Sequence, residues 1–211
     1  MGTQETGRGV NSYSQPQPIR MRRFYWLLLT ATCLLLTACA STPPVVKIGL
    51  VAPFEGRDRP IGYDVIYSAR LAVREINNQG GIEGTYVALV ALDDGGDVFL
   101  AEATAQSLAI DPAVVAVIGH WLPETTTAAA TIYTTAGLPL FLPGPTIPPT
   151  DLAAEFRQRY EDLTPFNETP GPYAGTAYEA MQTVFAALAA AQAQHDTINR
   201  ETVSQHHSPP D

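Results

Sequence analysis

The chain is poor in cysteine and carries none of the short motifs that mark common catalytic centres. Cys33 and Cys39 are the only cysteines among 211 residues, so no internal disulfide can form in the part that follows Cys39. The sequence contains no G-x-S-x-G, H-E-x-x-H, P-loop or G-x-G-x-x-G pattern. We therefore expect stability to come from packing, and we expect no enzymatic activity, no cofactor and no metal.

Basic residues are also scarce. The chain has 12 Lys and Arg against 21 Asp and Glu, which gives a formal net charge of -9. After Cys39, 8 basic and 20 acidic residues remain, a net charge of −12. A surface this acidic argues against a nucleic-acid partner, whose phosphates need Lys and Arg. It is compatible with an exported domain.

One long hydrophobic run is present, over residues 24–40. Arg22 and Arg23 precede it, and small residues close it at Leu36-Thr37-Ala38-Cys39. A basic start, an apolar centre of this length and a small-residue end are typical of a secretory signal peptide. The ending resembles the bacterial lipobox, in which the cysteine is lipidated and becomes the new N-terminus. We therefore expect an extracytoplasmic protein of the bacterial cell envelope, anchored to the membrane by lipid on Cys39.

A retained membrane anchor is the alternative interpretation of this segment. The run has 17 residues, at the short end of the range of about 17–25 that a spanning helix needs. This length favours the signal peptide. We interpret residues 1–20 as a disordered extension or a start assigned too early, 21–38 as the lipoprotein signal peptide, and 39–45 as a linker.

Strand and helix patterns alternate after the linker. Alternation of this kind implies parallel βαβ units, and strands that are apolar throughout are typical of a sheet covered on both faces. We predict an α/β fold of three layers, with a mostly parallel sheet and helices on both faces. The predicted strands are 45–52, 86–92, 114–118 and 138–142, and the predicted helices between them are 62–77, 97–109 and 123–136.

The pattern changes after residue 142. A Pro-rich segment over 143–150 breaks the alternation, and two helices follow over 152–163 and 173–193 with no strand between them. We predict a first lobe over 46–150, two returning helices within 151–193 that complete it, and a disordered polar tail over 194–211, in which His206 and His207 are inert.

In open parallel sheets, ligands bind beyond the carboxyl ends of the strands. Three predicted loops leave such ends, at 53–61, 119–123 and 143–150. The second loop carries His120 and Trp121 and leads into a helix, whose free N-terminal amides suit a carboxylate. Together the loops predict one wall of a polar small-molecule site.

Each of these residues also has a purely structural interpretation. Trp121 is as well suited to a position in the core or at its rim as to contact with a ligand. His120 has no partner at metal-ligand spacing and is better explained as a structural or exposed histidine. Thr125 and Thr126 satisfy the free amides of a helix start. Asp93-Asp94 is most simply a pair that caps the turn after its strand.

Several stretches together resemble a known family. The most specific is a helix ending in Asn77 followed by the turn Gly80-Gly81-Ile82-Glu83-Gly84. With the other stretches, residues 46–150 resemble the first lobe of type I periplasmic binding proteins, in particular the leucine/isoleucine/valine-binding group of ABC importers. The other stretches are Val46-Lys47-Ile48-Gly49-Leu50, Ala69 to Ile76, Asp93-Asp94, Val117-Ile118-Gly119-His120, Ile132-Tyr133 and Ala136-Gly137-Leu138-Pro139.

The resemblance implies a protein that captures a branched-chain amino acid or a related small polar solute and delivers it to permease subunits. It implies that Thr146 holds the charged groups of the ligand with its hydroxyl and backbone. Glu124 departs from the family, which has small hydroxyl residues after the Gly-His pair, and its charge would repel a ligand carboxylate. The ligand-binding residues that we expect are Trp121, Thr125, Thr126, Gly144 and Thr146.

Most of the family's second lobe is absent from this sequence, and the chain passes directly to the returning helices. An alternative function is therefore a single-lobe lipoprotein that acts as a protein–protein interaction module. A third hypothesis is an envelope enzyme that uses Glu55, Asp93 and His120.

Overall fold

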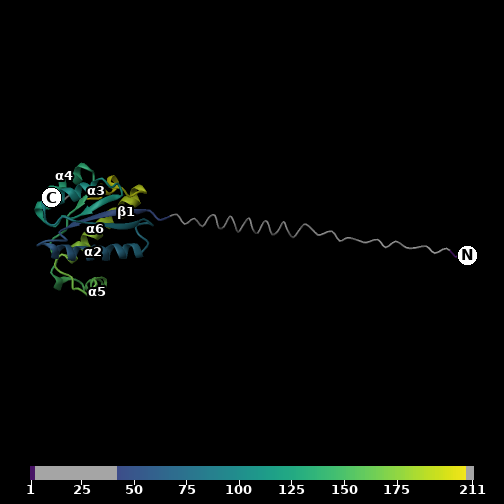
Figure 1. Ribbon diagram of the computed structural model, residues 1–211, viewed down its shortest axis with the longest axis horizontal. Coiled ribbons are helices and arrows are strands. Elements are labelled where there is room, and N and C mark those ends of the chain that lie inside the picture. The colour runs from purple at the N-terminus through teal and green to yellow at the C-terminus, as the bar shows by residue number, and fades with distance from the viewer. Residues whose placement is uncertain (3–41, 208–211) are drawn as a thin grey trace. The chain divides into compact units, whose positions relative to one another are not determined.

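The computed structural model describes residues 1–2 and 42–207 (Figure 1). The predicted signal peptide and Cys39 lie outside the described residues. The elements are β1 (Val45–Ala52), α2 (Arg59–Asn78), β2 (Tyr86–Asp93), α3 (Val98–Ala109), β3 (Val114–Ile118), α4 (Pro123–Thr135), β4 (Leu140–Phe141), a 3-10 turn (Pro149–Asp151), α5 (Ala154–Leu163), α6 (Ala174–His195) and α7 (Arg200–Ser204).

The sheet is parallel, with the strand order β2-β1-β3-β4. β1 pairs with β2 along its whole length, from Val45 opposite Tyr86 to Ala52 opposite Asp93. Each crossover between strands contains a helix, so the predicted α/β fold with a parallel sheet is confirmed. All four strands therefore begin at one edge of the sheet and end at the other.

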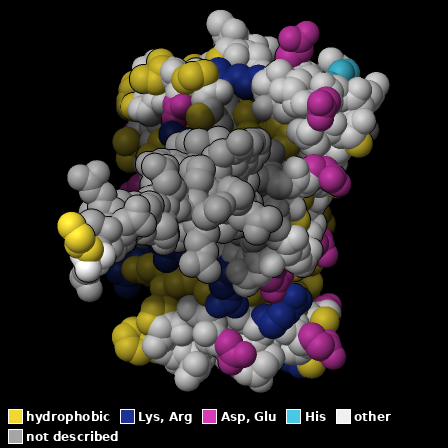
Figure 2. Space-filling view, turned by 90° about the vertical axis from the view of Figure 1, so that its right-hand side faces the viewer, with side chains coloured by type: hydrophobic (Ala, Val, Ile, Leu, Met, Phe, Trp, Pro, Cys, Tyr) yellow, Lys and Arg dark blue, Asp and Glu magenta, His cyan; other side chains and the backbone are white. Residues whose placement is uncertain are grey.

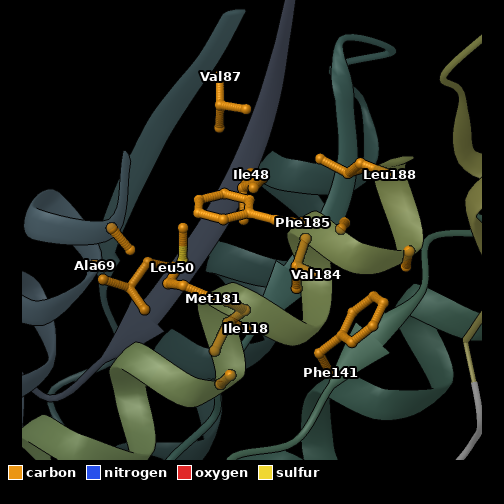
Figure 3. Close-up of a cluster of buried hydrophobic side chains, with 14 of the residues drawn as sticks. Ile48, Leu50, Ala69, Val87, Ile118, Phe141, Met181, Val184, Phe185 and Leu188 are labelled. Atoms are coloured by element: carbon orange, nitrogen blue, oxygen red, sulfur yellow. The ribbon is translucent and has the colours of Figure 1, made fainter. Parts of the chain in front are cut away.

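Helices cover both faces of this sheet. Helices α2 and α6 pack together on one face, and α3 and α4 pack together on the other (Figure 1). Successive residues of β1 alternate between these two cores, since Leu50 joins the first and Val51 the second. Figure 3 shows the first core, in which Met181 and Leu188 of α6 lie with Ile48 of β1. This packing explains why β1 is apolar at nearly every position.

Gly49 in the middle of β1 sets the distance between the sheet and α3. A Cβ atom on this residue would lie 2.8 Å from a methyl group of Leu108. A larger residue at this position would force the Leu108 side chain of α3 to move. The absence of a side chain thus allows the second core to close tightly.

The segment after α6 differs from the prediction. The structure has a helix α7 in place of a disordered tail, and Val203 within it is fully buried. His207 meets the ring of Phe141 edge-on at 4.6 Å between ring centroids and donates from Nε2 to the Leu140 carbonyl at 2.8 Å. The prediction of a disordered tail is therefore wrong for residues 196–207, and His207 is a packed residue of the lobe.

Arg200 explains why this segment is ordered. Its guanidinium donates to the carbonyls of Val114, Ala109, Leu108 and Asp111 at 2.6–3.3 Å, and to that of Ala136 at 3.4 Å. Two of these carbonyls belong to the last turn of α3, where the helix dipole favours a cation. One side chain thus ties α7 to α3, to β3 and to the end of α4.

Within residues 42–207, the structure contains no helix long and apolar enough to cross a membrane.

Candidate functional site

The loops at the carboxyl ends of the four strands meet at one edge of the sheet. The backbone N–H of Phe54, after β1, donates to Asp93 Oδ1 at the end of β2 at 2.7 Å. The same oxygen accepts from Gly95 N–H at 2.8 Å. The loops after β1 and β2 are therefore held together, as expected for neighbouring parallel strands.

A buried chain of polar side chains connects the ends of β2 and β3 to α4. Asp94 Oδ2 lies 2.7 Å from His120 Nδ1, and His120 Nε2 lies 3.2 Å from the hydroxyl of Tyr133. The Asp94 and His120 side chains are both 0% exposed. Burial, and to a lesser extent the charge of Asp94, raises the pKa of Tyr133, so its hydroxyl stays protonated. The histidine is a structural residue, as the sequence suggested, and the aspartate does more than cap its turn.

Gly119 allows this chain to form. Its φ is 125°, and a Cβ atom there would lie 2.2 Å from the Val51 carbonyl oxygen. Only glycine permits such an approach. The close contact with β1 brings the next residue, His120, into the interior beside Asp94.

The two threonines at the start of α4 serve the backbone. Thr125 is fully buried, and its hydroxyl donates to the Leu122 carbonyl at 3.1 Å. Thr126 is half-buried and donates to the carbonyls of His120 and Leu122 at 3.1 and 2.8 Å. Burial leaves Thr125 no surface for a ligand, so its assignment as a ligand contact is wrong. The helix-start interpretation accounts for it.

Trp121 lies half-buried between the loops and α6. Its ring meets Tyr173 edge-on, with centroids 6.2 Å apart and planes at 87°. Its indole Nε1 is buried and has no hydrogen-bond partner within residues 42–207. A buried indole N–H normally finds an acceptor, so this donor is left unsatisfied within the described residues.

Asp64 of α2 fixes the position of Tyr173. Its carboxylate accepts from the backbone N–H groups of Gly171 at 3.2 Å and Tyr173 at 3.1 Å. Burial raises the pKa of Asp64, and the two amide bonds partly oppose that shift. This residue therefore caps the start of α6 from another helix and sets the wall against which Trp121 packs. No local pattern in the sequence indicates this role.

The last loop of the edge follows β4. The Gly144 carbonyl accepts from the Thr176 hydroxyl at 3.0 Å, and the backbone N–H of Ile147 donates to the Pro172 carbonyl at 3.0 Å. These bonds hold the loop against the start of α6. Thr146 between them is exposed. Trp121, Gly144 and Thr146 are thus all held near the start of α6, whereas Thr125 faces the interior.

Two hollows lie beside this loop cluster. One, of about 380 Å³, extends from Thr126 and Leu142 along the outer side of β4 to His207. The other, of about 430 Å³, lies between α5 and α6 and includes Ile147 and Arg159. Within the part of the chain that the structure describes, no group of three or more His, Cys, Asp and Glu side chains is placed to hold a metal ion.

Comparison with known proteins identifies the family. Residues 45–151 match the model of the periplasmic binding protein family. The chain belongs to this family. Its members bind solutes and are not enzymes, so the enzyme hypothesis is set aside. Asp93 and His120, two of the residues on which that hypothesis relied, are engaged in structural hydrogen bonds.

Curated relatives carry names that agree with this family. The chain is 34% identical over 103 residues to an amino acid binding protein of Pseudomonas aeruginosa, an alignment that covers 49% of this chain and 28% of the relative. It is 31% identical over 129 residues to the Leu/Ile/Val-binding protein of Escherichia coli, covering 61% of this chain and 34% of the relative. The matched region spans about a third of the length of these relatives.

A solved structure is similar over the same region. It is the branched-chain amino acid transporter substrate-binding protein of Streptococcus pneumoniae in complex with isoleucine, with 33% sequence identity and a TM-score of 0.46. The alignment covers 47% of this chain and 29% of that chain.

Proposed function

We propose that this chain is the solute-binding component of an ABC importer, tethered to a membrane by lipid on Cys39. It captures a branched-chain amino acid or a related small polar solute outside the cytoplasm. The observation that carries this proposal is the family match over residues 45–151, together with relatives named for amino acids and for Leu/Ile/Val. The lipobox-like ending at Cys39 supports the tether.

The ligand contacts follow from the carboxyl edge of the sheet. In this proposal, the exposed Thr146 hydroxyl and the backbone around Gly144 hold the charged groups of an amino acid, and Trp121 offers an apolar face and one free indole donor. Thr126 contributes its hydroxyl oxygen as an acceptor. Glu124 at the start of α4 is exposed, and its carboxylate disfavours a ligand carboxylate at that helix end.

Thermal unfolding of the full chain in detergent tests the proposal. Leucine, isoleucine or valine at about 100 times its dissociation constant stabilises the folded state by about 2.7 kcal/mol if binding is confined to that state. We expect one of the three to raise the melting temperature, and we expect Thr146→Ala to abolish most of that rise. Thr150→Ala is the matched control, because Thr150 is also exposed but bonds to Asp151. A melting temperature indifferent to all three amino acids contradicts the proposal that the solute is a branched-chain amino acid.

A second candidate function is a protein–protein interaction module. Exposed apolar side chains at the carboxyl edge favour it: Phe99 is 80% exposed, Leu100 40% and Leu142 37%. Such side chains suit a protein partner that covers this edge. A chain that stays strictly monomeric at high concentration in light scattering, and whose melting temperature rises with an amino acid, argues against this candidate.

A further inference from the structure

The amino edge of the sheet is the edge closest in sequence to Cys39. Only residues 40–44 separate Cys39 from Val45, the first residue of β1. Six chain steps, fully extended, span about 20 Å. Whatever holds Cys39 therefore holds the start of β1 within that distance.

This short tether excludes one orientation of the domain on a membrane. β1 has 8 residues, and at about 3.3 Å per residue it is roughly 26 Å long. If the carboxyl edge lay against the bilayer, Val45 would stand farther from the surface than the tether reaches. A domain that rests on the bilayer must therefore present either its amino edge or one of its sides to it.

An apolar patch on the amino edge decides between these two orientations. Val45 is 51% exposed, Tyr86 37% and Ile110 82%, and Pro44 and Pro112 are also exposed. Pro44, Val45 and Tyr86 are neighbours, because Tyr86 N–H donates to the Pro44 carbonyl at 2.8 Å and Val45 pairs with Tyr86. Lys47 N–H donates to the Ala113 carbonyl at 2.8 Å, which brings in the loop after α3. We name these five residues the amino-edge patch.

One pair of opposite charges lies beside the patch. Lys47 Nζ lies 2.7 Å from the Asp111 carboxylate, an ion pair at the same edge. Figure 2 looks onto the side of the molecule on which β1 begins, where hydrophobic, Lys, Arg, Asp and Glu side chains are all visible. An apolar patch with a neutralised pair beside it suits the boundary between lipid headgroups and acyl chains.

We infer that the amino-edge patch rests on the surface of the lipid bilayer to which Cys39 is anchored, and that the carboxyl edge faces away from that bilayer. This inference rests on the lipid anchor of the proposed function. It adds which face of the domain lies against the membrane and where the carboxyl-edge loops lie relative to that membrane. Exposed apolar side chains occur at both edges, and the length of the tether selects the amino edge.

Spin labels at the two ends of α3 test the inference. Ile110 and Phe99 are 82% and 80% exposed, and 11 helical residues place them about 16 Å apart. Ile110→Cys and Phe99→Cys are made in the full chain carrying Cys33→Ser, so that the new thiol is the free one once Cys39 is lipidated. Each labelled protein is reconstituted into phosphatidylcholine–phosphatidylglycerol vesicles. Collision rates of the nitroxide with membrane-soluble oxygen and with a water-soluble nickel chelate are then compared.

We expect the ratio of oxygen to nickel collisions to be several-fold higher at position 110 than at position 99. Inserting 20 Gly and Ser residues after Ser41 adds roughly 25 Å of reach and is expected to shrink the difference. Equal ratios at the two positions, or a higher ratio at position 99, would overturn the inference. If the insertion leaves the difference between the two positions unchanged, the short tether is not the cause of the orientation.

Intact mass separates this inference from the proposed function. If the mass shows lipid on Cys39 but the ratios of oxygen to nickel collisions are equal at positions 110 and 99, the inferred orientation is wrong. The solute-binding proposal is not affected by that result. A chain without lipid on Cys39 that does not sediment with membranes overturns the anchor, and with it this inference.

Discussion

At the scale of single residues, the most consequential feature is the buried chain from Asp94 through His120 to Tyr133. Asp94→Ala removes the acceptor 2.7 Å from His120 Nδ1 and leaves that polar group unpaired in the interior. An unpaired buried group costs about 1–3 kcal/mol, and more when it is charged. We expect the free energy of unfolding in urea to fall by at least about 2 kcal/mol. Asp97→Ala is the control: it removes the exposed cap of α3 and costs about 1 kcal/mol. Equal losses would contradict the role of the buried chain.

Two tyrosines predict the response to alkaline pH. Burial raises the pKa of Tyr133 and Tyr160 above the ordinary value of about 10. Because the folded-state pKa is the higher one, their contribution to stability is complete below pH 10 and is lost as the pH rises further. Above pH 10, each tyrosine lowers the free energy of unfolding by up to about 1.4 kcal/mol per pH unit. Urea unfolding between pH 9 and 11 measures this slope. Tyr160→Phe is expected to make it shallower, and an unchanged slope would contradict the assignment.

At the scale of secondary-structure elements, α7 shows how one side chain holds a short helix in place. Arg200→Ala removes the donors to carbonyls at the ends of α3 and α4, and we expect unfolding to become easier by about 2–4 kcal/mol. Arg200→Lys should restore only part of this, because an ammonium lacks the planar fork. Arg157→Ala, at an exposed site on α5, should change stability by less than about 0.5 kcal/mol. Urea unfolding compares the three, and an Arg200→Ala loss as small as that of Arg157→Ala would contradict the role of the fork.

The elements that could be predicted are those with a strong local pattern. β1 and β3 are runs of β-branched and small apolar residues, and their bounds agree with the structure. The start of α4 was predictable because proline fits the first position of a helix. α7 was missed because a five-residue polar helix has no local stability of its own. Its order comes from contacts of Arg200 with residues 64 or more positions earlier, which no window of sequence displays.

At the scale of the whole molecule, the predicted strand topology was enough to group the loops of the candidate site. The orientation of the individual side chains in those loops could not be predicted in the same way. Parallel strands bring their carboxyl ends to one edge, so the loops with Trp121, Gly144 and Thr146 could be grouped from the sequence. The inward orientation of Thr125 and the pairing of Asp94 with His120 could not. Both depend on the path of the loop at Gly119 and on how β1, β2 and β3 line up, which only the folded chain fixes.

The indole of Trp121, which has no hydrogen-bond partner within residues 42–207, has an optical consequence. The chain has two tryptophans, and Trp26 leaves with the leader if that segment is cleaved. The emission spectrum of the processed protein then reports on one ring, half-buried beside Tyr173 at the carboxyl edge. A solute, a partner or a second lobe that gives Nε1 an acceptor should change the wavelength and intensity of that emission. The protein therefore contains an intrinsic fluorophore at the place where its function is proposed to occur, and no added label is needed to follow it.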